Sequence, residues 1–377
     1  MTAERPHTHP PGPPAPPTSP QSPVPSNESA LQIEGSVSFP TKELLTEQWN
    51  GDVPHLFFHP LIVNPEMAFD GDRFHSFMHK WFVTKEELLR ILEELYARDY
   101  VLVDFYDSIS YESGGSSDAP RAVARRTSFA VPAGKKPLII SIDDLNYYPD
   151  TTLHGGALGL VIDVKGQLMA RVPDGSGGEE LSNEGEIPLL LERFIEKHPD
   201  FSWRGGRGII GLTAYNGFLG YRTNDPHNSN RDQDSIKARD VANALKAMGW
   251  HFACHSWGHI HPGRMSATEY RNIEERWQRE AAPIIGSTDL FIFPFGALPF
   301  DDPGKLAALQ DLGYRVLFPV DRNYTSYDKD GSLVINRIQM DGLVLSRKTH
   351  FILPFVDPSR VSLHPFRFSI DKQEPRA

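Results

Sequence analysis

The sequence predicts an α/β protein in which a parallel β-sheet is covered by helices. Short apolar segments alternate with amphipathic helical segments over roughly 300 residues. This alternation is typical of a parallel sheet that is either closed into a barrel or doubly wound. The 377 residues are 39% hydrophobic and 11% aromatic, which provides enough apolar side chains for a large core. The length allows one large α/β barrel or a few smaller domains.

The first 30 residues differ from the rest of the chain. A proline-rich run occupies residues 10–17, and further prolines follow up to Pro25. Such a composition favours neither helix nor sheet, so we predict a disordered tail or extended linker over residues 1–30. The segment has no positively charged stretch followed by an apolar one. We therefore expect neither a secretory signal nor an anchor in this chain.

The first half of the remaining chain is predicted to begin with a strand over residues 53–58. Thr84 and Glu87 have the spacing of a capping box, which opens an amphipathic helix with leucines along one face. Two further apolar strands follow, at residues 100–103 and 137–142.

Residues 151–186 are predicted to be an insertion. Apolar segments on either side of a Lys-Gly turn indicate a β-hairpin over residues 158–172, and the glycine-rich stretch after it is expected to be a loop. Helices and strands then alternate again, and the elements are predicted in this order: helix 187–197, strand 208–214, a helix capped by Asp234 or Ser235 that runs to about residue 248, strand 250–254, a helix opened by a capping box at residues 266–269, strand 290–293, helix 302–313 and strand 315–320.

Composition and motifs argue against several classes of protein. The net charge of −11, without a basic run, disfavours binding to nucleic acid. No apolar stretch approaches the roughly 18 residues that a membrane-spanning helix requires. Neither the Gly-x-Gly-x-x-Gly pattern after the first strand nor a P-loop is present. Cys254 is the single cysteine, so a metal site would use His, Asp or Glu side chains, and the sequence has 15 His.

Polar or aromatic residues follow three of the predicted strands, and the carboxyl ends of parallel strands share one edge of a sheet. Asp143 and Asp144 point in opposite directions if the chain is extended, so one can bind a metal while the other faces a substrate. His255 and His259 have the i, i+4 spacing that places both on one face of a helical turn, within reach of one ion. Residues 293–296 form an aromatic turn that suits the wall of a sugar site. Taken singly, these segments also fit a loop start, chance histidines and an apolar turn.

Together and in this order, the segments Ser-Ile-Asp-Asp-Leu, His-Ser-Trp-Gly-His and Ile-Phe-Pro-Phe-Gly resemble the motifs of the polysaccharide deacetylases of the NodB homology domain, carbohydrate esterase family four. The resemblance covers about residues 50–345. It implies an irregular (β/α) barrel with fewer than eight complete units, formed by residues 31–377 as a single domain. It also implies a hydrolase that removes N-acetyl groups, or less often O-acetyl groups, from a glycan. A location in the cell envelope or outside the cell follows from the resemblance alone, and the cytoplasm is the alternative.

The resemblance assigns the chemical roles. It implies that Asp143 is the catalytic base and that Asp144, His255 and His259 hold one divalent metal ion. Zn²⁺ is the expected metal, with Co²⁺ and Ni²⁺ as alternatives, because neutral imidazole suits all three.

The resemblance also implies a substrate groove whose wall includes Pro294 and Phe295. Two further aromatic residues, Tyr215 and Trp257, come soon after predicted strands and are candidates for contact with the substrate. Aromatic side chains at the rim favour a sugar over a small amide.

The sequence departs from the family pattern at three points. Leu145 replaces the glycine of the first motif, and Ile292 occupies the place of an arginine that hydrogen-bonds the catalytic aspartate. The late Leu-x-Leu-His motif, which supplies the general acid, has no counterpart with the right spacing. His350 lies near the expected place and His59 lies at the end of the first strand, so both are candidates for the acid.

Two other functions stay open at this stage. A relative that kept the fold and lost the acid would be a catalytically silent carbohydrate-binding protein. A metal amidohydrolase acting on a small non-sugar amide is the second alternative. An amide needs an acid for its leaving amine more than an ester does, so the missing late histidine favours ester substrates or loss of activity. Asp143 favours an enzyme, since a binding protein has no use for a base beside a metal.

Overall fold

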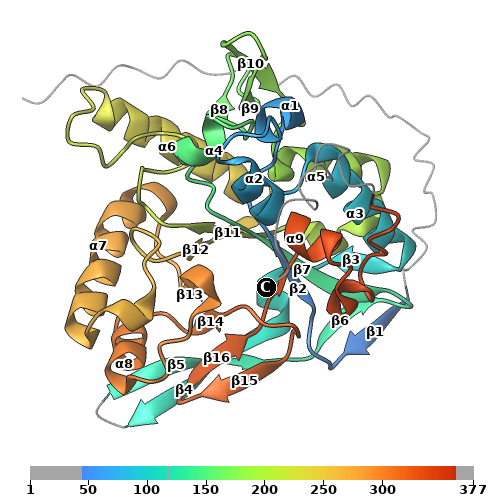
Figure 1. Cartoon of the computed structure of the whole chain (residues 1–377). Coiled ribbons are helices and arrows are strands. Elements are labelled where there is room, and N and C mark those ends of the chain that lie inside the picture. Colours follow the sequence, from blue (N-terminus) through green and yellow to red (C-terminus); the bar gives the residue numbers. More distant parts are fainter. Residues whose placement is uncertain (1–44, 117–118, 362–377) are drawn as a thin grey trace, which may run out of the picture. The chain divides into compact units, whose positions relative to one another are not determined.

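The computed structural model describes residues 45–116 and 119–361. The predicted tail over residues 1–30 lies outside the described residues. The fold is mixed α/β, as the alternation of elements predicted, and one large sheet runs through its middle (Figure 1).

The large sheet contains most of the predicted strands. They are β2 (His55–Phe58), β3 (Tyr100–Leu102), β7 (Lys136–Asp143), β11 (Gly208–Leu212), β12 (Trp250–Cys254), β13 (Leu290–Ile292), β14 (Val316–Phe318), β15 (Ser326–Lys329), β16 (Ser332–Ile335) and β17 (Ile338–Gln339). The hydrogen-bonded order is β15-β16-β14-β13-β12-β11-β7-β2-β17, and β3 pairs with β7 off this path. β15 is antiparallel to β16, whereas the other neighbours run parallel, which confirms the predicted parallel sheet.

A further contact links two strands that are distant in this order. An isolated parallel bridge joins Val320, shortly after β14, to Arg337, which directly precedes β17. The backbone N–H of Arg337 donates to the carbonyl of Pro319, and that of Asp321 donates to the carbonyl of Arg337. The segment that leads into β17 therefore lies beside the end of β14, while β17 itself pairs with β2.

The central strands are buried on both faces. In β7, Leu138 and Ile140 belong to the larger hydrophobic cluster, while Ile139 belongs to a second cluster. Because side chains alternate along a strand, Ser141 and Asp143 point to the same face as Ile139. That face is apolar at the start of β7 and becomes polar toward the carboxyl end of the strand.

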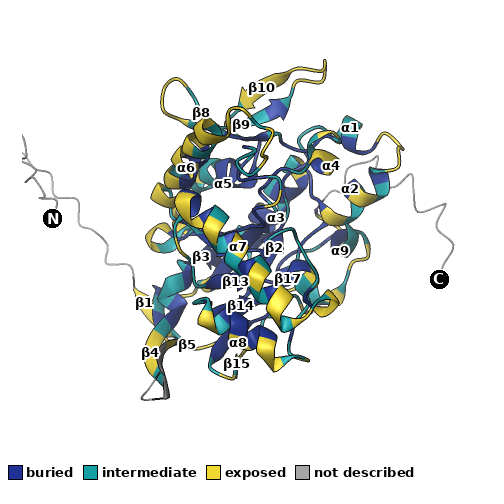
Figure 2. Cartoon of the chain, turned by 90° about the vertical axis from the view of Figure 1, so that its left-hand side faces the viewer, coloured by how far each residue is buried: buried dark blue, intermediate teal, exposed yellow. Residues whose placement is uncertain are grey.

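Helices cover the strands (Figure 1). They are α1 (Pro65–Ala68), α2 (His75–Trp81), α3 (Lys85–Ala97), α4 (Pro149–Thr152), α5 (Ile187–Lys197), α6 (Arg231–Ala247), α7 (Ala267–Ile285), α8 (Pro303–Asp311) and α9 (Gly342–Ser346). α7 packs against α6 and α8, and α3 packs against α5. Exposed residues lie on the outer surfaces of these helices and buried residues on the strands beneath them (Figure 2).

The helix starts were predicted with mixed success. Both predicted capping boxes are present at the beginnings of α3 and α7, with reciprocal hydrogen bonds between the N-cap side chain and the glutamate three residues later. The predicted start of α6 is wrong, because this helix begins at Arg231 and contains Asp234 and Ser235 in its first turns. The carboxylate of Asp234 accepts a hydrogen bond from the side chain of Asn228 instead of capping the helix.

The described residues also form three smaller sheets. These are β1 (Thr46–Trp49) with β6 (Phe129–Pro132), β4 (Ile109–Ser116) with β5 (Ala119–Arg126), and β8 (Gly159–Ile162) with β9 (Leu168–Pro173) and β10 (Glu179–Ser182). The hairpin predicted within the insertion is confirmed as β8 and β9. The prediction of a loop after this hairpin is wrong in part, because the segment contains β10, which pairs with β9. Asp174 closes the intervening turn by accepting hydrogen bonds from the backbone of Ser176 and Gly178.

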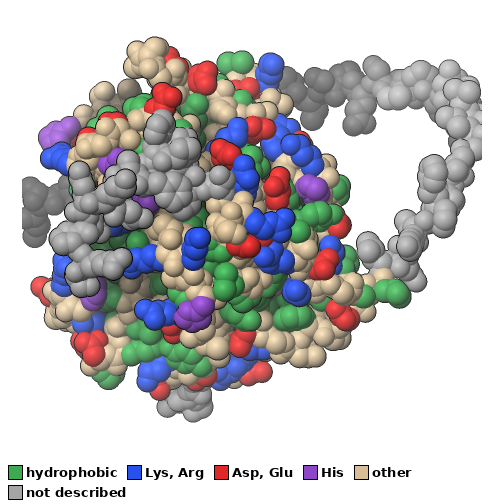
Figure 3. Space-filling view, turned by 45° about the vertical axis from the view of Figure 1, so that its right-hand side comes forward, with side chains coloured by type: hydrophobic (Ala, Val, Ile, Leu, Met, Phe, Trp, Pro, Cys, Tyr) green, Lys and Arg blue, Asp and Glu red, His purple; other side chains and the backbone are tan. Residues whose placement is uncertain are grey.

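The outer surface is mixed in charge. Acidic and basic side chains are interspersed over the face seen in Figure 3, between patches of apolar atoms. Among the described helices, none combines the length and the apolar character needed to cross a membrane.

Candidate active site

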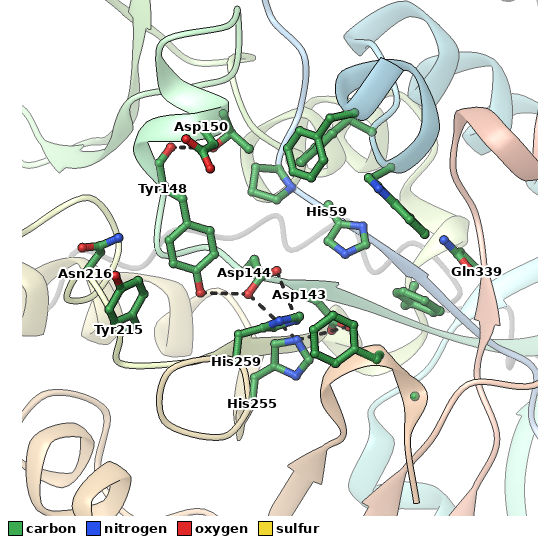
Figure 4. Close-up of a pocket in the computed structure, with 18 of the residues that line it drawn as sticks. His59, Asp143, Asp144, Tyr148, Asp150, Tyr215, Asn216, His255, His259 and Gln339 are labelled. Carbon is green, nitrogen blue, oxygen red and sulfur yellow. Dashed lines mark hydrogen bonds and ion pairs between the residues drawn. The ribbon is translucent and has the colours of Figure 1, made fainter. Parts of the chain in front are cut away.

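A cavity of about 770 Å³ opens where several strands of the large sheet end (Figure 4). Its lining includes His59 after β2, Asp143 at the end of β7, His255 after β12 and Phe293 after β13. The three segments that the sequence singled out thus meet in one cavity. This is the arrangement expected when functional residues follow the carboxyl ends of parallel strands.

Asp143 and Asp144 both line this cavity although they are adjacent in the chain. Asp143 is the last residue of β7, and Asp144 follows it with a φ of 64°, in the left-handed region. The divergence expected of an extended chain therefore does not hold here, because the backbone changes direction at Asp144.

His255 and His259 also come together, but not on a helical turn. They belong to an irregular turn in which Ser256, Gly258 and His259 have φ values of 56°, 80° and 52°. The backbone N–H of Gly258 donates to the carbonyl of Thr213, which ties the turn to the chain just after β11. The prediction of a helical turn is wrong for this reason, yet the two imidazole rings lie with their centroids 5.0 Å apart.

Asp144, His255 and His259 form a cluster that fits a metal ion. Their three ligand atoms lie within 4.8 Å of one another. Asp144 Oδ1 is 3.9 Å from His255 Nε2, and Asp144 Oδ2 is 3.8 Å from His259 Nε2. In a tetrahedral zinc site the ligand atoms lie about 3.4 Å apart, so a small inward movement suffices. Two imidazoles and one carboxylate are also a donor set that zinc accepts while keeping a position open.

The hydrogen bonding of His255 suits a ligand. Its Nδ1 lies 3.0 Å from the carbonyl oxygen of Ile292, so an Nδ1–H donates there and the Nε2 lone pair faces Asp144. Burial lowers the pKa of His255, although Asp143 and Asp144 act in the opposite direction. The imidazole is therefore neutral near pH 7, the form that binds metal. Ile292, at the place of the missing arginine, orients this ligand through its backbone.

A guanidinium that sequence analysis missed comes from another strand. Arg337 is fully buried, and its Nη1 and Nη2 donate to Asp143 Oδ1 and Oδ2 at 2.8 and 2.9 Å. Its Cζ lies 4.3 Å from the centre of the Phe57 ring. The sequence signal that could have found this residue is a lone arginine within the apolar run of residues 333–338.

Arg337 sets the charge state of Asp143. Burial by itself would raise the pKa of Asp143, but the Arg337 guanidinium, helped by His255, holds this pKa well below its usual range. Arg337 Nη1 also donates to Ser141 Oγ at 3.0 Å, and that oxygen lies 2.9 Å from His55 Nε2. This buried row of polar groups, Ser141 and His55, holds Arg337 in place.

Tyr148 holds Asp144 in position, as Arg337 does Asp143. Its hydroxyl donates to Asp144 Oδ1 at 3.1 Å (Figure 4). The same hydroxyl also contacts Thr213 Oγ1. Burial raises the pKa of Tyr148 well above its usual value, and Asp144 adds to this effect. The phenol therefore stays protonated and fixes one oxygen of Asp144, as groups around metal-binding carboxylates commonly do.

Only one of the two candidate acids lies in the cavity. His59 is part of its lining, and the buried Nδ1 of His59 has no hydrogen-bond partner among the described residues. His350 is exposed on the short 3-10 helix η6 (His350–Ile352) and lies outside the lining. α9 separates His350 from the end of β17, so the structure does not bring this residue to the site.

Exposed aromatic rings line the cavity around this cluster. Tyr215 and Phe295, both predicted, are 47% and 64% exposed. The Phe295 ring centroid lies 4.6 Å from that of His259. Phe77 and Trp81 of α2 add two partly exposed rings that sequence analysis missed.

The other two predicted substrate residues lie outside the lining. Pro294 is buried at the start of the 3-10 helix η5 (Pro294–Gly296). The ring of Trp257 faces the guanidinium of Arg276 at 3.4 Å, and its Nε1 donates to Glu280. α7 thus occupies one face of the Trp257 ring and its N–H group.

The insertion contributes little to the cavity. Thr151 at its start lines the cavity, but no residue of β8, β9 or β10 does. The part of the insertion that follows α4 therefore leaves the cluster accessible.

Neither a family model nor a curated protein matches the chain. Among the solved structures that it resembles is the Streptococcus pyogenes deacetylase PplD in complex with acetate, at 12% identity and a TM-score of 0.44, covering 83% of this chain and 99% of that chain. A de-N-acetylase from Aggregatibacter actinomycetemcomitans has 11% identity and a TM-score of 0.45, and the match covers 82% of this chain and 100% of that chain. The chitin deacetylase from the fungal pathogen Colletotrichum lindemuthianum has 12% identity and a TM-score of 0.26, and the match covers 47% of this chain and 77% of that chain. These three solved structures are deacetylases, the class that the sequence motifs resemble.

Proposed function

We propose that this protein is a metal-dependent hydrolase that removes N-acetyl groups from a glycan. One observation carries the proposal: the carboxylate of Asp143, paired with Arg337, lies beside a cluster that could hold a metal ion, in a cavity lined by exposed aromatic rings. We also propose that the large sheet forms an irregular (β/α) barrel of the NodB type. The bridge between Val320 and Arg337 supports this, because it joins β14 to the segment whose continuation pairs with β2.

Asp144, His255 and His259 would hold the ion, for which Zn²⁺ is the first choice and Co²⁺ and Ni²⁺ are alternatives. When bound, such an ion supplies polarisation of the acetyl carbonyl and lowers the pKa of water toward about 7. Tyr148 and the carbonyl of Ile292 keep the ligands oriented, through Asp144 and His255.

Asp143 would act as the general base. Its Oδ2 lies 3.9 Å from His255 Nε2, so a water at the cluster is within reach of the carboxylate, which takes up the proton as the water attacks. Arg337 keeps Asp143 ionised and fixes both of its oxygens. His59, in the same cavity, would protonate the leaving amine, which departs poorly without a proton.

This arrangement favours a deacetylase over the alternatives. A catalytically silent sugar-binding protein would not need a buried arginine that keeps a second carboxylate ionised beside the cluster. A small non-sugar amide would not need a cavity of about 770 Å³ with aromatic rings on several sides. An O-acetyl ester would gain less from His59, because an alcohol leaves more readily than an amine.

Acetate release from acetylated chito-oligosaccharides tests the proposal. Protein dialysed against a chelator should be inactive, and one equivalent of Zn²⁺, Co²⁺ or Ni²⁺ should restore activity. His59→Ala should slow acetate release by roughly 10²-fold and largely spare an activated acetate ester, while the matched control His350→Ala should leave both rates unchanged. Activity that survives chelation, or metal-loaded protein that releases no acetate from any acetylated glycan, would contradict the proposal.

A further inference from the structure

The described residues that line the cavity include negative side chains but no lysine or arginine. Their ionisable groups are the carboxylates of Asp143, Asp144 and Asp150, three imidazoles and the phenols of Tyr148 and Tyr215. A glycan that carries carboxylate or phosphate groups would therefore find neither a lysine nor an arginine to pair with along this lining. A glycan that carries amines would find acceptors.

One of the three carboxylates is unengaged. Asp143 is paired with Arg337, and Asp144 faces Tyr148 and the two histidines. Asp150, in the first turn of α4, is exposed, and its side chain has no hydrogen bond or ion pair with another described residue. Its charge is thus free to act on a bound molecule.

Asp150 lies on the same side of the metal-binding cluster as Tyr215 and Asn216, and Gln339 lies on the opposite side (Figure 4). The exposed ring of Tyr215 can support the face of a sugar, and the amide of Asn216 can hydrogen-bond sugar hydroxyls. This side of the cavity therefore offers one sugar unit a platform, a polar partner and a negative charge.

We propose that this side of the cavity binds a sugar unit with a free amine, next to the N-acetylated unit that reacts. The inference rests on the proposed function and narrows its substrate to a partly de-N-acetylated, cationic glycan. In the reaction, water is consumed as the amide C–N bond breaks, acetate leaves, and the glycan keeps an amine that carries a positive charge once it is protonated. Each turnover thus creates the charge that Asp150 binds, so later turnovers on the same chain become easier.

Three tetrasaccharides test this with the metal-loaded protein at low ionic strength and a pH at which the amine is protonated. They are fully N-acetylated chitotetraose, the same tetramer with one free amine beside an acetylated unit, and a hyaluronan tetrasaccharide that alternates N-acetyl and carboxylate sugars. We expect kcat/KM for acetate release to be about three- to fivefold higher on the amine-bearing tetramer than on the fully acetylated one, and lowest on the acidic one. The difference should appear in KM, because Asp150 does not touch the reacting group.

Variants of Asp150 identify the source of the preference. Asp150→Asn should abolish it, and Asp150→Lys should turn it toward the acidic tetrasaccharide. The matched control Asp232→Asn, an exposed aspartate in the first turn of α6 and outside the cavity, should keep it. Equal kcat/KM on the first two tetramers, or a preference that persists in Asp150→Asn, would overturn the inference. A failure of the proposed function looks different, since no tetrasaccharide would then release acetate.

Discussion

Asp143 and Asp144 are neighbours in the chain with different partners. Both oxygens of Asp143 are hydrogen-bonded by Arg337, whereas those of Asp144 face two imidazoles and the hydroxyl of Tyr148. A carboxylate already bound by a guanidinium is poorly suited to ligate a metal, so we assign the base and the ligand to different residues. Mutation should separate the two roles.

Asp143→Asn should keep the metal and lose the base. We expect metal content near that of the wild type and turnover reduced by roughly 10²-fold or more, the usual size of a general-base contribution. His255→Ala should instead lose the metal, and activity with it. Metal analysis of the purified variants, combined with acetate release, measures both effects. If Asp143→Asn strips the metal as completely as His255→Ala does, the assignment of the base is wrong. If it changes neither metal content nor turnover, Asp143 has no role in catalysis.

Removing Arg337 should cost stability. Arg337→Met leaves the buried carboxylate of Asp143 without its partner, and breaking a buried ion pair in this way typically lowers the free energy of unfolding by about 3–5 kcal/mol. The double variant Asp143→Asn, Arg337→Met should be more stable than Arg337→Met alone, because it carries no unpaired buried charge. Urea unfolding compares these variants with Arg231→Met, a change at an exposed arginine that should matter little. If Arg337→Met has the same free energy of unfolding as the wild type, the ion pair between Asp143 and Arg337 does not contribute to stability.

The residues of the cluster could be predicted from the sequence because their signals are local. Adjacent aspartates and two histidines four residues apart stand out in a single reading. Arg337 could not be predicted, since it lies 194 residues from Asp143 in the chain and only the fold brings the two together. Trp257 is a different case, because its position in the motif suggested the rim, whereas its ring packs against α7 and lies outside the cavity lining.

At the scale of elements, α7 supports the turn that carries both histidines. Its Glu274 is fully buried and accepts hydrogen bonds from Ser256 Oγ at 2.5 Å and from Cys254 Sγ at 3.4 Å. Burial raises the pKa of the Cys254 thiol well above its usual value, so this residue stays protonated and belongs to the core. Glu274 thereby links the end of β12 and the following turn to one helix.

This link should be visible in the pH dependence of stability. Burial raises the pKa of Glu274 to about 8 and that of Glu186 to about 7, against hydrogen bonds that lower both. Between the ordinary value of 4.5 and these values, the folded chain keeps a proton that the unfolded chain has lost. The free energy of unfolding therefore falls as pH rises through this window, by at most about 1.4 kcal/mol per pH unit for each group.

The two glutamates can be told apart by their windows. Between pH 7 and 8 the Glu274 contribution continues while that of Glu186 is nearly complete. Glu274→Gln should therefore flatten the fall in stability between pH 7 and 8, and Glu186→Gln should leave most of it in place. Urea unfolding of chelator-treated protein at pH 5, 6, 7 and 8 measures these slopes without interference from metal binding. An identical slope above pH 7 in the wild type and in Glu274→Gln would contradict the pKa shift of Glu274.

Some helices and strands could be predicted from the sequence and others could not. β7 and β12 are short runs of mostly apolar residues, and α3 and α7 begin with capping boxes, so both kinds were found. β4 reads Ile-Ser-Tyr-Glu-Ser-Gly-Gly-Ser, which has too few apolar side chains to give a period-two pattern, and it was missed together with its partner β5. β10 was missed for a similar reason, because only its pairing with β9 makes its mostly polar residues a strand.

At the scale of the whole molecule, the parallel sheet could be predicted but the position of its last strand could not. β17 has only two residues, and the bridge from Arg337 to Val320 is a single one. Neither β17 nor this bridge leaves a pattern in the sequence, since the position of each follows from the order of the earlier strands in the sheet. Yet this short segment places Arg337 against Asp143, so the global arrangement completes the candidate site that local motifs only outlined.

The same arrangement couples metal binding to global stability. Asp144 follows β7 while both histidines follow β12, and β11 lies between these two strands in the sheet. An ion that binds only the folded chain should raise the free energy of unfolding by about 2.7 kcal/mol at 100 times Kd and about 4.1 kcal/mol at 1,000 times Kd. For a chain of this size we expect an increase in melting temperature of roughly 4–6 °C when Zn²⁺ is added to chelator-treated protein. His259→Ala should lose most of this increase, because it removes one of the three ligands, whereas the matched change His350→Ala should keep it. An equal increase in His259→Ala and the wild type would mean that the ion binds elsewhere, and the assignment of the cluster would then be wrong.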